Sequence, residues 1–172
     1  MNAGETYERA GCELTAELLR RQCTVRIRVT GSSMAPALWP GDVIVVRPTA
    51  KQTPSIGAIA VCIRAGRLAA HRVVEIAQQG GEHRWITRGD ALAHRDPAMS
   101  AAQMLGVVAG TIRADGSFRP VSPALSLAHR VLSCAIRHSE LIHRLALAVH
   151  RVLNRLDGTG LQSLEGAGGK FP

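Results

Sequence analysis

Residues 23–47 read CTVRIRVTGSSMAPALWPGDVIVVR, in which a segment rich in turn residues lies between two runs rich in Val and Ile. Residues 23–30 alternate Val and Ile with Arg and Thr, which is the period of a strand with one face in water. Residues 31–42 are rich in Gly, Ser and Pro and predict a turn. Residues 43–47 predict a second strand. The stretch therefore predicts a β-protein in which a turn-rich segment lies between two strands.

Further strands and one helix are predicted on either side of this stretch. The strands are predicted at 58–64, 68–77, 84–88 and 105–113, with turns at 65–66, 78–81 and 115–116. Residues 5–22 carry leucines at a helical period, with acidic residues early and arginines late, which suits a helix dipole. About six or seven short strands with tight turns are typical of an antiparallel β-structure. We therefore expect a mainly β (α+β) fold with a partly closed antiparallel sheet.

The chain divides into four segments, of which 123–157 has the most regular charge pattern. An arginine recurs there every seven residues, at Arg130, Arg137, Arg144 and Arg151. This spacing predicts a long amphipathic helix or a helical hairpin. The basic stripe leaves three interpretations open. It is the solvated face of a helix that packs on the β-domain, the face of a helix that lies on an anionic membrane surface, or part of a coiled coil with a partner. The other segments are expected to be an N-terminal helix at 1–22, the β-domain at 23–122 and a disordered tail at 158–172.

The composition argues against a membrane-spanning protein, a secreted protein and a small domain held by disulfides or a metal. The 172 residues are 46% hydrophobic, enough for one domain with a core, but only 3% are aromatic, so the core must consist of Val, Ile, Leu and Ala. No apolar run approaches the ~20 residues of a membrane span, and the first residues lack the apolar part of a secretory signal. The four cysteines are scattered without a CxxC pair, so we expect no metal site, no disulfide framework and no cofactor.

The charge narrows the range of partners. The formal net charge is +8, but the arginines are dispersed and few aromatic residues accompany them, which argues against a nucleic acid partner. The cysteine usage fits the reducing cytoplasm. We expect a cytoplasmic protein, with peripheral membrane contact through residues 123–157 as an open alternative.

Ser33 lies where a catalytic serine could be held. A serine that follows a strand in a turn framed by Gly and Pro keeps its Oγ exposed beside backbone N–H groups. Such a placement suits a nucleophile next to an oxyanion hole, but it also suits a plain polar turn. Residue types alone leave both interpretations open.

The order of four segments indicates a family. GSSMAPALWPGDVIVV (31–46) resembles the Ser-Met-x-Pro and Pro-Gly-Asp signature of the signal peptidase I-like serine peptidases of the S24/S26 group. AHRVV (70–74), ITRGDA (86–91) and LGVVAG (105–110) resemble, in the same order, the segments that follow in that family. The resemblance covers about residues 24–112, and it implies that 23–122 is a peptidase domain of this type.

The resemblance assigns roles to several residues. The family's nucleophile immediately precedes the Met, which makes Ser33 the nucleophile and His71 the general base. Asp96, six residues beyond Asp90, is preferred as the acid that orients His71, with Asp90 as the alternative. The residues expected to frame the site are Ser32, Met34 and Pro36. The residues expected to brace turns are Gly41, Asp42, Gly89 and Asp90.

The scarcity of lysine bears on the identity of the base. Bacterial signal peptidases and self-cleaving repressors use a desolvated lysine, but this chain has only Lys51, in a polar loop, and Lys170, in the expected tail. His71 lies on an apolar strand, and an imidazole titrates near neutral pH. This resembles the Ser–His branch of the family. Gly31 stands where many members have a serine that assists the oxyanion hole, and Arg88 replaces the usual lysine.

The resemblance implies a serine endopeptidase that acts on a peptide or protein substrate. It would cleave an extended segment of signal- or leader-peptide type through an acyl-enzyme, with the substrate added beside a strand. Two alternatives stay open. One is a catalytically silent binding module whose basic helix contacts a membrane or partner, and the other is a self-cleaving, repressor-like regulator.

Overall fold

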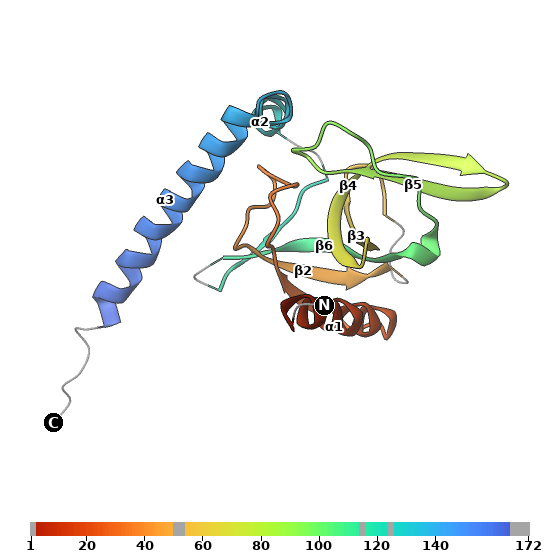
Figure 1. Ribbon diagram of the computed structural model, residues 1–172, viewed down its shortest axis with the longest axis horizontal. Coiled ribbons are helices and arrows are strands. Elements are labelled where there is room, and N and C mark those ends of the chain that lie inside the picture. The colour runs from red at the N-terminus through yellow and green to blue at the C-terminus, as the bar shows by residue number, and fades with distance from the viewer. Residues whose placement is uncertain (1–2, 50–53, 114–115, 124–125, 166–172) are drawn as a thin grey trace.

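Seven strands form one antiparallel sheet in the computed structural model, which describes residues 3–49, 54–113, 116–123 and 126–165 (Figure 1). The strands are β1 (Val25–Arg28), β2 (Val43–Pro48), β3 (Ile59–Arg64), β4 (Arg67–Gln79), β5 (Glu82–Arg88), β6 (Met104–Ile112) and β7 (Phe118–Pro120). The helices are α1 (Ala3–Arg20), α2 (Leu127–His138) and α3 (Glu140–Glu165), with a 3-10 turn at Ala101–Gln103. Every strand predicted from the alternation of apolar residues is therefore present, and the predicted N-terminal helix is α1.

The sheet is open. Its strands lie in the order β1-β2-β6-β3-β4-β5, and β7 pairs with the end of β6. The expectation of a partly closed structure is therefore wrong, because β1 and β5 lie at opposite ends of this order. β1 is only four residues long and leads at once into the turn that contains Ser33. Its outer edge borders a cavity instead of another strand.

The main core lies between the sheet and α1. Ile44 and Val46 point inward from β2 and pack with Leu19 of α1 in a cluster of aliphatic side chains. Full burial of an aliphatic side chain contributes about 1.5–3 kcal/mol, so this cluster fixes α1 across the sheet. The prediction of an aliphatic core is confirmed for this cluster. A second core cluster is not purely aliphatic, because it contains Trp85 packed with Met99.

A tight hairpin sets the register of the strand that carries His71. β3 and β4 are joined by Ala65 and Gly66, both at positive φ (47° and 75°), as in the two-residue turns whose twist matches that of antiparallel strands. The turn places Arg64 opposite Arg67 and Ala60 opposite His71. The local sequence therefore fixes where along the sheet the imidazole lies.

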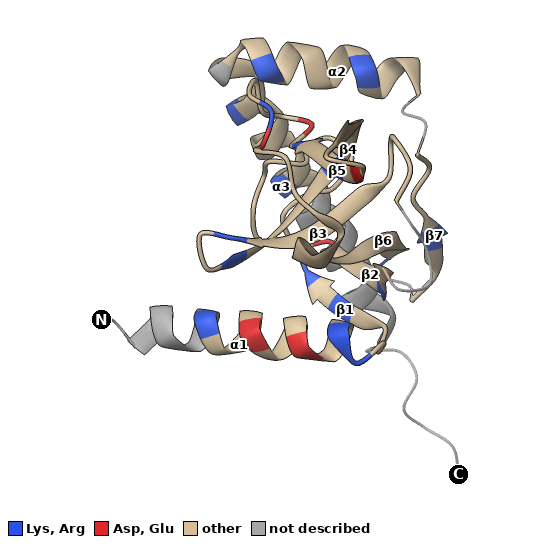
Figure 2. Cartoon of the chain, turned by 90° about the vertical axis from the view of Figure 1, so that its right-hand side faces the viewer, with Lys and Arg blue, Asp and Glu red and all other residues tan. Residues whose placement is uncertain are grey.

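The C-terminal segment forms two helices on one side of the sheet (Figures 1 and 2). Ser126 caps α2, since its side chain accepts the His129 N–H, and Ser139 is the C-cap that follows the last helical residue, His138. Helix α3 continues through Glu165, past the point where we expected a disordered tail to begin, and residues 166–172 lie outside the described part. Within the described residues, none of the helices has both the length and the apolar character needed to cross a bilayer.

Candidate active site

The turn after β1 holds Ser33 on a braced loop. The Trp39 N–H donates to the Asp42 carboxylate at 2.8 Å, so Asp42 closes the turn. Gly41 has a φ of 102°, a conformation that L side chains rarely adopt, and its N–H donates to Val29 O. Met34 is buried below the loop. The turn-bracing roles expected for Gly41 and Asp42 therefore agree with their contacts.

His71 points toward Ser33 from β4, the strand between β3 and β5 in the sheet. Its Nε2 lies 3.1 Å from Ser33 Oγ. The imidazole is nearly buried, with 8% of the residue exposed. Successive side chains of a strand point to opposite faces, so the next residue, Arg72, is buried on the other face of β4. The apolar strand predicted around His71 thus delivers the imidazole to the turn.

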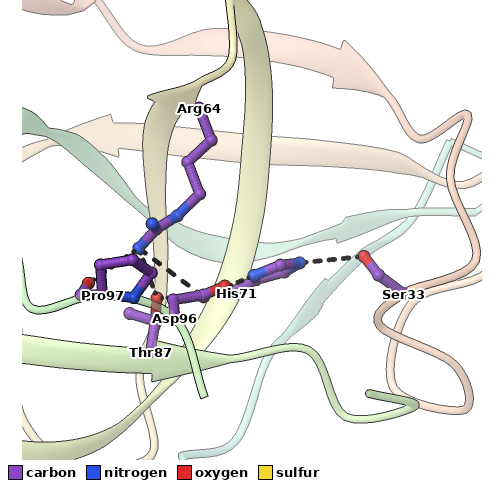
Figure 3. A network of polar contacts seen from close by, with 6 residues as sticks. All are labelled: Ser33, Arg64, His71, Thr87, Asp96 and Pro97. Atoms are coloured by element: carbon purple, nitrogen blue, oxygen red, sulfur yellow. Dashed lines mark hydrogen bonds and ion pairs between the residues drawn. The ribbon is translucent and has the colours of Figure 1, made fainter. Parts of the chain in front are cut away.

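Asp96 completes a chain of side chains that begins at Ser33 (Figure 3). Its Oδ2 lies 2.7 Å from His71 Nδ1 and 2.6 Å from Thr87 Oγ1. The Asp96 N–H donates to Thr87 O at 2.8 Å, which fixes the loop after β5 against that strand. Arg64 Nη2 lies 3.2 Å from Thr87 Oγ1 and 3.7 Å from Asp96 Oδ2.

The direction of each hydrogen bond follows from the groups involved. A guanidinium only donates and an ionised carboxylate only accepts. Arg64 therefore donates to the Thr87 hydroxyl, which donates its own proton to Asp96. His71 donates to the same carboxylate through Nδ1–H, which leaves the Nε2 lone pair facing the Ser33 hydroxyl. The network thus fixes the imidazole tautomer that a general base requires.

Asp90, the alternative acid, lies in a different contact. Its carboxylate pairs with Arg72, with Nη2–Oδ2 at 2.7 Å and Nε–Oδ1 at 2.9 Å. Both side chains are about 6% exposed. Arg72 Nη1 also donates to Gly57 O, and Arg137 of α2 donates to Asp90 O. Asp90 therefore braces the loop between β5 and Asp96, and of the two acids Asp96 is the one in contact with His71.

Gly89 lets this loop pass close to the turn that carries Ser33. A Cβ at position 89 would lie 2.6 Å from Ser33 O and 2.9 Å from Leu92 Cγ, both too close. The Ala91 N–H donates to Ser33 O at 2.9 Å. The Gly89–Asp90 segment expected to brace a turn thus also fixes the backbone of Ser33.

The remaining predicted residues frame the turn. Ser32 contributes its carbonyl, which accepts the Ala35 N–H, and Pro36 is buried. The Ser33 N–H donates to no backbone carbonyl within the described residues, which leaves it able to bind an oxyanion. A Cβ at Gly31 would meet no atom within 4 Å, so the structure has room for a side chain at this position.

A cavity of about 510 Å³ adjoins the pair Ser33 and His71. It lies between residues 27–31 and residues 67–71 of β4, and α1 contributes Gly11, Cys12 and Thr15. β5 pairs with β4 only from Arg72 onward, so the outer edge of residues 68–71 has no partner among the described strands. The cavity thus has the shape of a groove between two open strand edges.

Sequence reasoning missed Arg64, and it left Thr87 without a role. Arg64 lies at the end of a strand, where an arginine reads as an ordinary solvated residue, so no pattern marks it. Thr87 lies in ITRGDA, one of the segments that resemble the family, but that resemblance was not used to give it a role. Lys51 and Lys170, the two lysines considered as bases, lie outside the described residues. In the described part of the chain, no three His, Cys, Asp or Glu side chains are placed to hold a metal ion.

The comparisons with known proteins agree with this architecture. A search among curated proteins finds no match. The family model for peptidase S24-like domains matches residues 2–108, which include α1, the turn, His71 and Asp96. That family belongs to the clan of S24/S26 signal peptidases and LexA-like proteins. Because the match covers more than half of the chain, the protein belongs to the peptidase S24-like family.

Proposed function

We propose that the protein is a serine endopeptidase in which Ser33 is the nucleophile, His71 the general base and Asp96 the group that orients His71. The observation that carries this proposal is an unbroken chain of three side chains. Ser33 Oγ lies 3.1 Å from His71 Nε2, and His71 Nδ1 lies 2.7 Å from Asp96 Oδ2. A nucleophile within reach of a base that a third group orients is the arrangement of a catalytic triad.

The proposed reaction proceeds through an acyl-enzyme. Ser33 Oγ attacks the scissile carbonyl carbon while His71 Nε2 takes the hydroxyl proton, and the Ser33 N–H stabilises the oxyanion. The C–N bond then breaks, and His71 gives the proton to the leaving amine. A water molecule attacks the ester, again losing a proton to His71, and Ser33 recovers its proton as the ester C–O bond breaks. Asp96 remains ionised and stabilises the imidazolium.

The groove supports an extended substrate. Residues 68–71 of β4 and the edge of β1 both offer strand edges without a neighbouring strand in the described part of the sheet. An extended peptide can add to such edges through main-chain hydrogen bonds. The lining is largely aliphatic and includes Met34, Leu38 and Leu68. We propose a substrate of signal- or leader-peptide type, presented in extended form with apolar side chains toward the groove.

Labelling by an acylating probe tests the nucleophile. A β-lactone is expected to open on Ser33 Oγ and add its whole mass to the wild-type chain, because His71 deprotonates this hydroxyl. Ser33→Ala should lose the label, whereas Ser55→Ala, the same change at an exposed serine, should keep it. Burial and the neighbouring carboxylate of Glu13 raise the pKa of the Cys12 thiol, so this thiol in the groove should react poorly.

Intact mass and peptide mapping read out the result. Equal labelling of wild type and Ser33→Ala, or a label that maps elsewhere, would contradict the assignment. Absence of any label on the wild type, together with no cleavage of a peptide library, would favour a silent binding module. Fragments that form when the purified chain is incubated alone, but not in Ser33→Ala, would identify self-cleavage, a mode that the family membership equally allows.

Asp96→Asn is expected to lower kcat by about 10³–10⁴-fold without unfolding the chain. An amide at position 96 can donate to His71 Nδ1, which moves the imidazole proton to Nε2 and removes the acceptor for the Ser33 hydroxyl. Asp90→Asn, which keeps the length of the side chain and one oxygen that accepts from Arg72, should retain kcat within about tenfold where both variants are folded. The reverse order of the two losses, measured on a peptide that the wild type cleaves, would assign the orienting role to Asp90.

A further inference from the structure

Helix α3 presents an apolar stripe to solvent. Its side toward the domain is partly buried, and there His150 stacks on Trp39 with ring centroids 4.6 Å apart. The opposite side carries Leu141, Leu145 and Val152, which are 78%, 65% and 55% exposed. Residues spaced by three, four, seven or eight positions share one helix face. The exposed side of α3 is therefore apolar where a solvated helix is normally polar.

Helix α2 repeats this arrangement. Ser133 and Ile136 are buried toward the domain, and Ile136 packs with Ala35 and Ala91. On the other side, Leu127 is 76% exposed and Val131 is 62% exposed. Both helices lie on the same side of the sheet (Figures 1 and 2). We name as the outer face six of the exposed apolar residues of the two helices, Leu127, Val131, Leu141, Leu145, Val149 and Val152.

Cationic side chains border the outer face. Arg130, Arg144 and Arg151 are exposed on the same two helices. Together the two helices contain five arginines and three acidic residues, so their net charge is positive. A second copy of the chain on this face would bring these exposed arginines toward the same arginines, and like charges repel. A surface of anionic lipid offers the opposite charge together with an apolar layer into which Leu and Val can insert.

We propose that the outer face of α2 and α3 binds the surface of an anionic lipid membrane. The Leu and Val side chains enter the boundary between headgroups and acyl chains, and the arginines contact lipid phosphates. α2 is fixed to the loops of the candidate site by Ile136 and by the bond from Arg137 to Asp90 O. Binding would therefore hold the Ser33 turn next to the membrane. The proposal rests on the helices alone and does not depend on peptidase activity.

Vesicle flotation of the full-length chain tests the proposal. The wild type should float with vesicles of phosphatidylcholine and phosphatidylglycerol at low salt, and Ser33→Ala should float equally. L141S/L145S should weaken binding by at least about thirtyfold, because two large apolar side chains no longer enter the lipid. L14S/I56S makes comparable changes at exposed apolar residues outside this face (62% and 61% exposed) and should bind as the wild type does.

A second pair of variants tests the charge. R130Q/R151Q should weaken binding to the anionic vesicles by about thirtyfold, whereas R47Q/R119Q, with the same change in net charge at exposed arginines of the sheet, should have little effect. Failure of the wild type to float, or equal binding of L141S/L145S and L14S/I56S, would overturn the proposal. A wild type that does not float, that light scattering shows to be a dimer, and that the L141S/L145S change converts to a monomer would also overturn the proposal.

Discussion

Replacing His71 with alanine is expected to lower kcat by about 10⁴–10⁶-fold, and adding Ser33→Ala should cost almost nothing more. The reason is that the two side chains act as one unit. Without the imidazole 3.1 Å from its Oγ, the Ser33 hydroxyl keeps its proton and is a weak nucleophile. Without Ser33, the imidazole has no proton to accept. Each single variant therefore already loses the whole covalent pathway.

The measurement is kcat of the wild type, both single variants and the double variant on one peptide that the wild type cleaves. His83→Ala is the matched control, because it removes an exposed histidine from the neighbouring strand β5. It should retain the wild-type rate. A His71→Ala variant within tenfold of wild type would exclude His71 as the base. Losses that multiply in the double variant would show that Ser33 and His71 act independently.

The sequence was sufficient to predict most of the strands. Strands with one wet face follow an alternation that residues 23–30 already show, and a strand such as β3, buried along most of its length, is bounded by Gly-containing turns. The openness of the sheet could not be predicted in this way. It depends on which edges pair, and the sheet contains register shifts between Val45 and Val46 and between Val73 and Glu75. Such bulges redirect a strand without changing the pattern of its residues.

The residues of the candidate site also fall into those that the sequence predicts and those that it does not. Ser33 and His71 were predicted because each lies in a segment that resembles the family, and the order of the segments carried the argument. Arg64 lies at the end of β3, where an arginine normally projects into water. Its contact with Thr87 joins residues 23 positions apart. A long-range contact of this kind follows from the packing of strands, and no local spacing encodes it.

The pairing of Arg72 with Asp90 was hidden for a related reason. HRVV reads as an apolar strand with two polar residues, and it does not show that both of them are buried. The sequence favoured Asp96 over Asp90 by its spacing alone, and it kept Asp90 as the alternative because both acids follow β5. The structure separates the two acids through their partners, since one contacts a guanidinium and the other an imidazole.

Loss of the buried ion pair between Arg72 and Asp90 is expected to have the largest effect on stability. Asp90→Ala should lower the free energy of unfolding by about 3–5 kcal/mol, because it leaves the Arg72 guanidinium buried without a counter-charge. Arg72 is only 5% exposed, and its remaining bond to Gly57 O does not neutralise it. Chemical denaturation, with equal slopes for both proteins, gives the difference in free energy.

Two further variants decide whether burial of the charge is the cause. Glu17→Ala breaks a comparable Arg–Glu pair on the surface of α1, at 2.8 Å between Arg21 Nε and Glu17 Oε1, and should cost less than about 1 kcal/mol. R72M/D90L replaces the buried pair by apolar side chains and should recover most of the loss, because no charge remains to be desolvated. If Asp90→Ala cost no more than Glu17→Ala, the buried pair would not be what holds the loop against Ser33. If R72M/D90L were as unstable as Asp90→Ala, the loss would arise from altered packing around position 90 and not from the unpaired guanidinium.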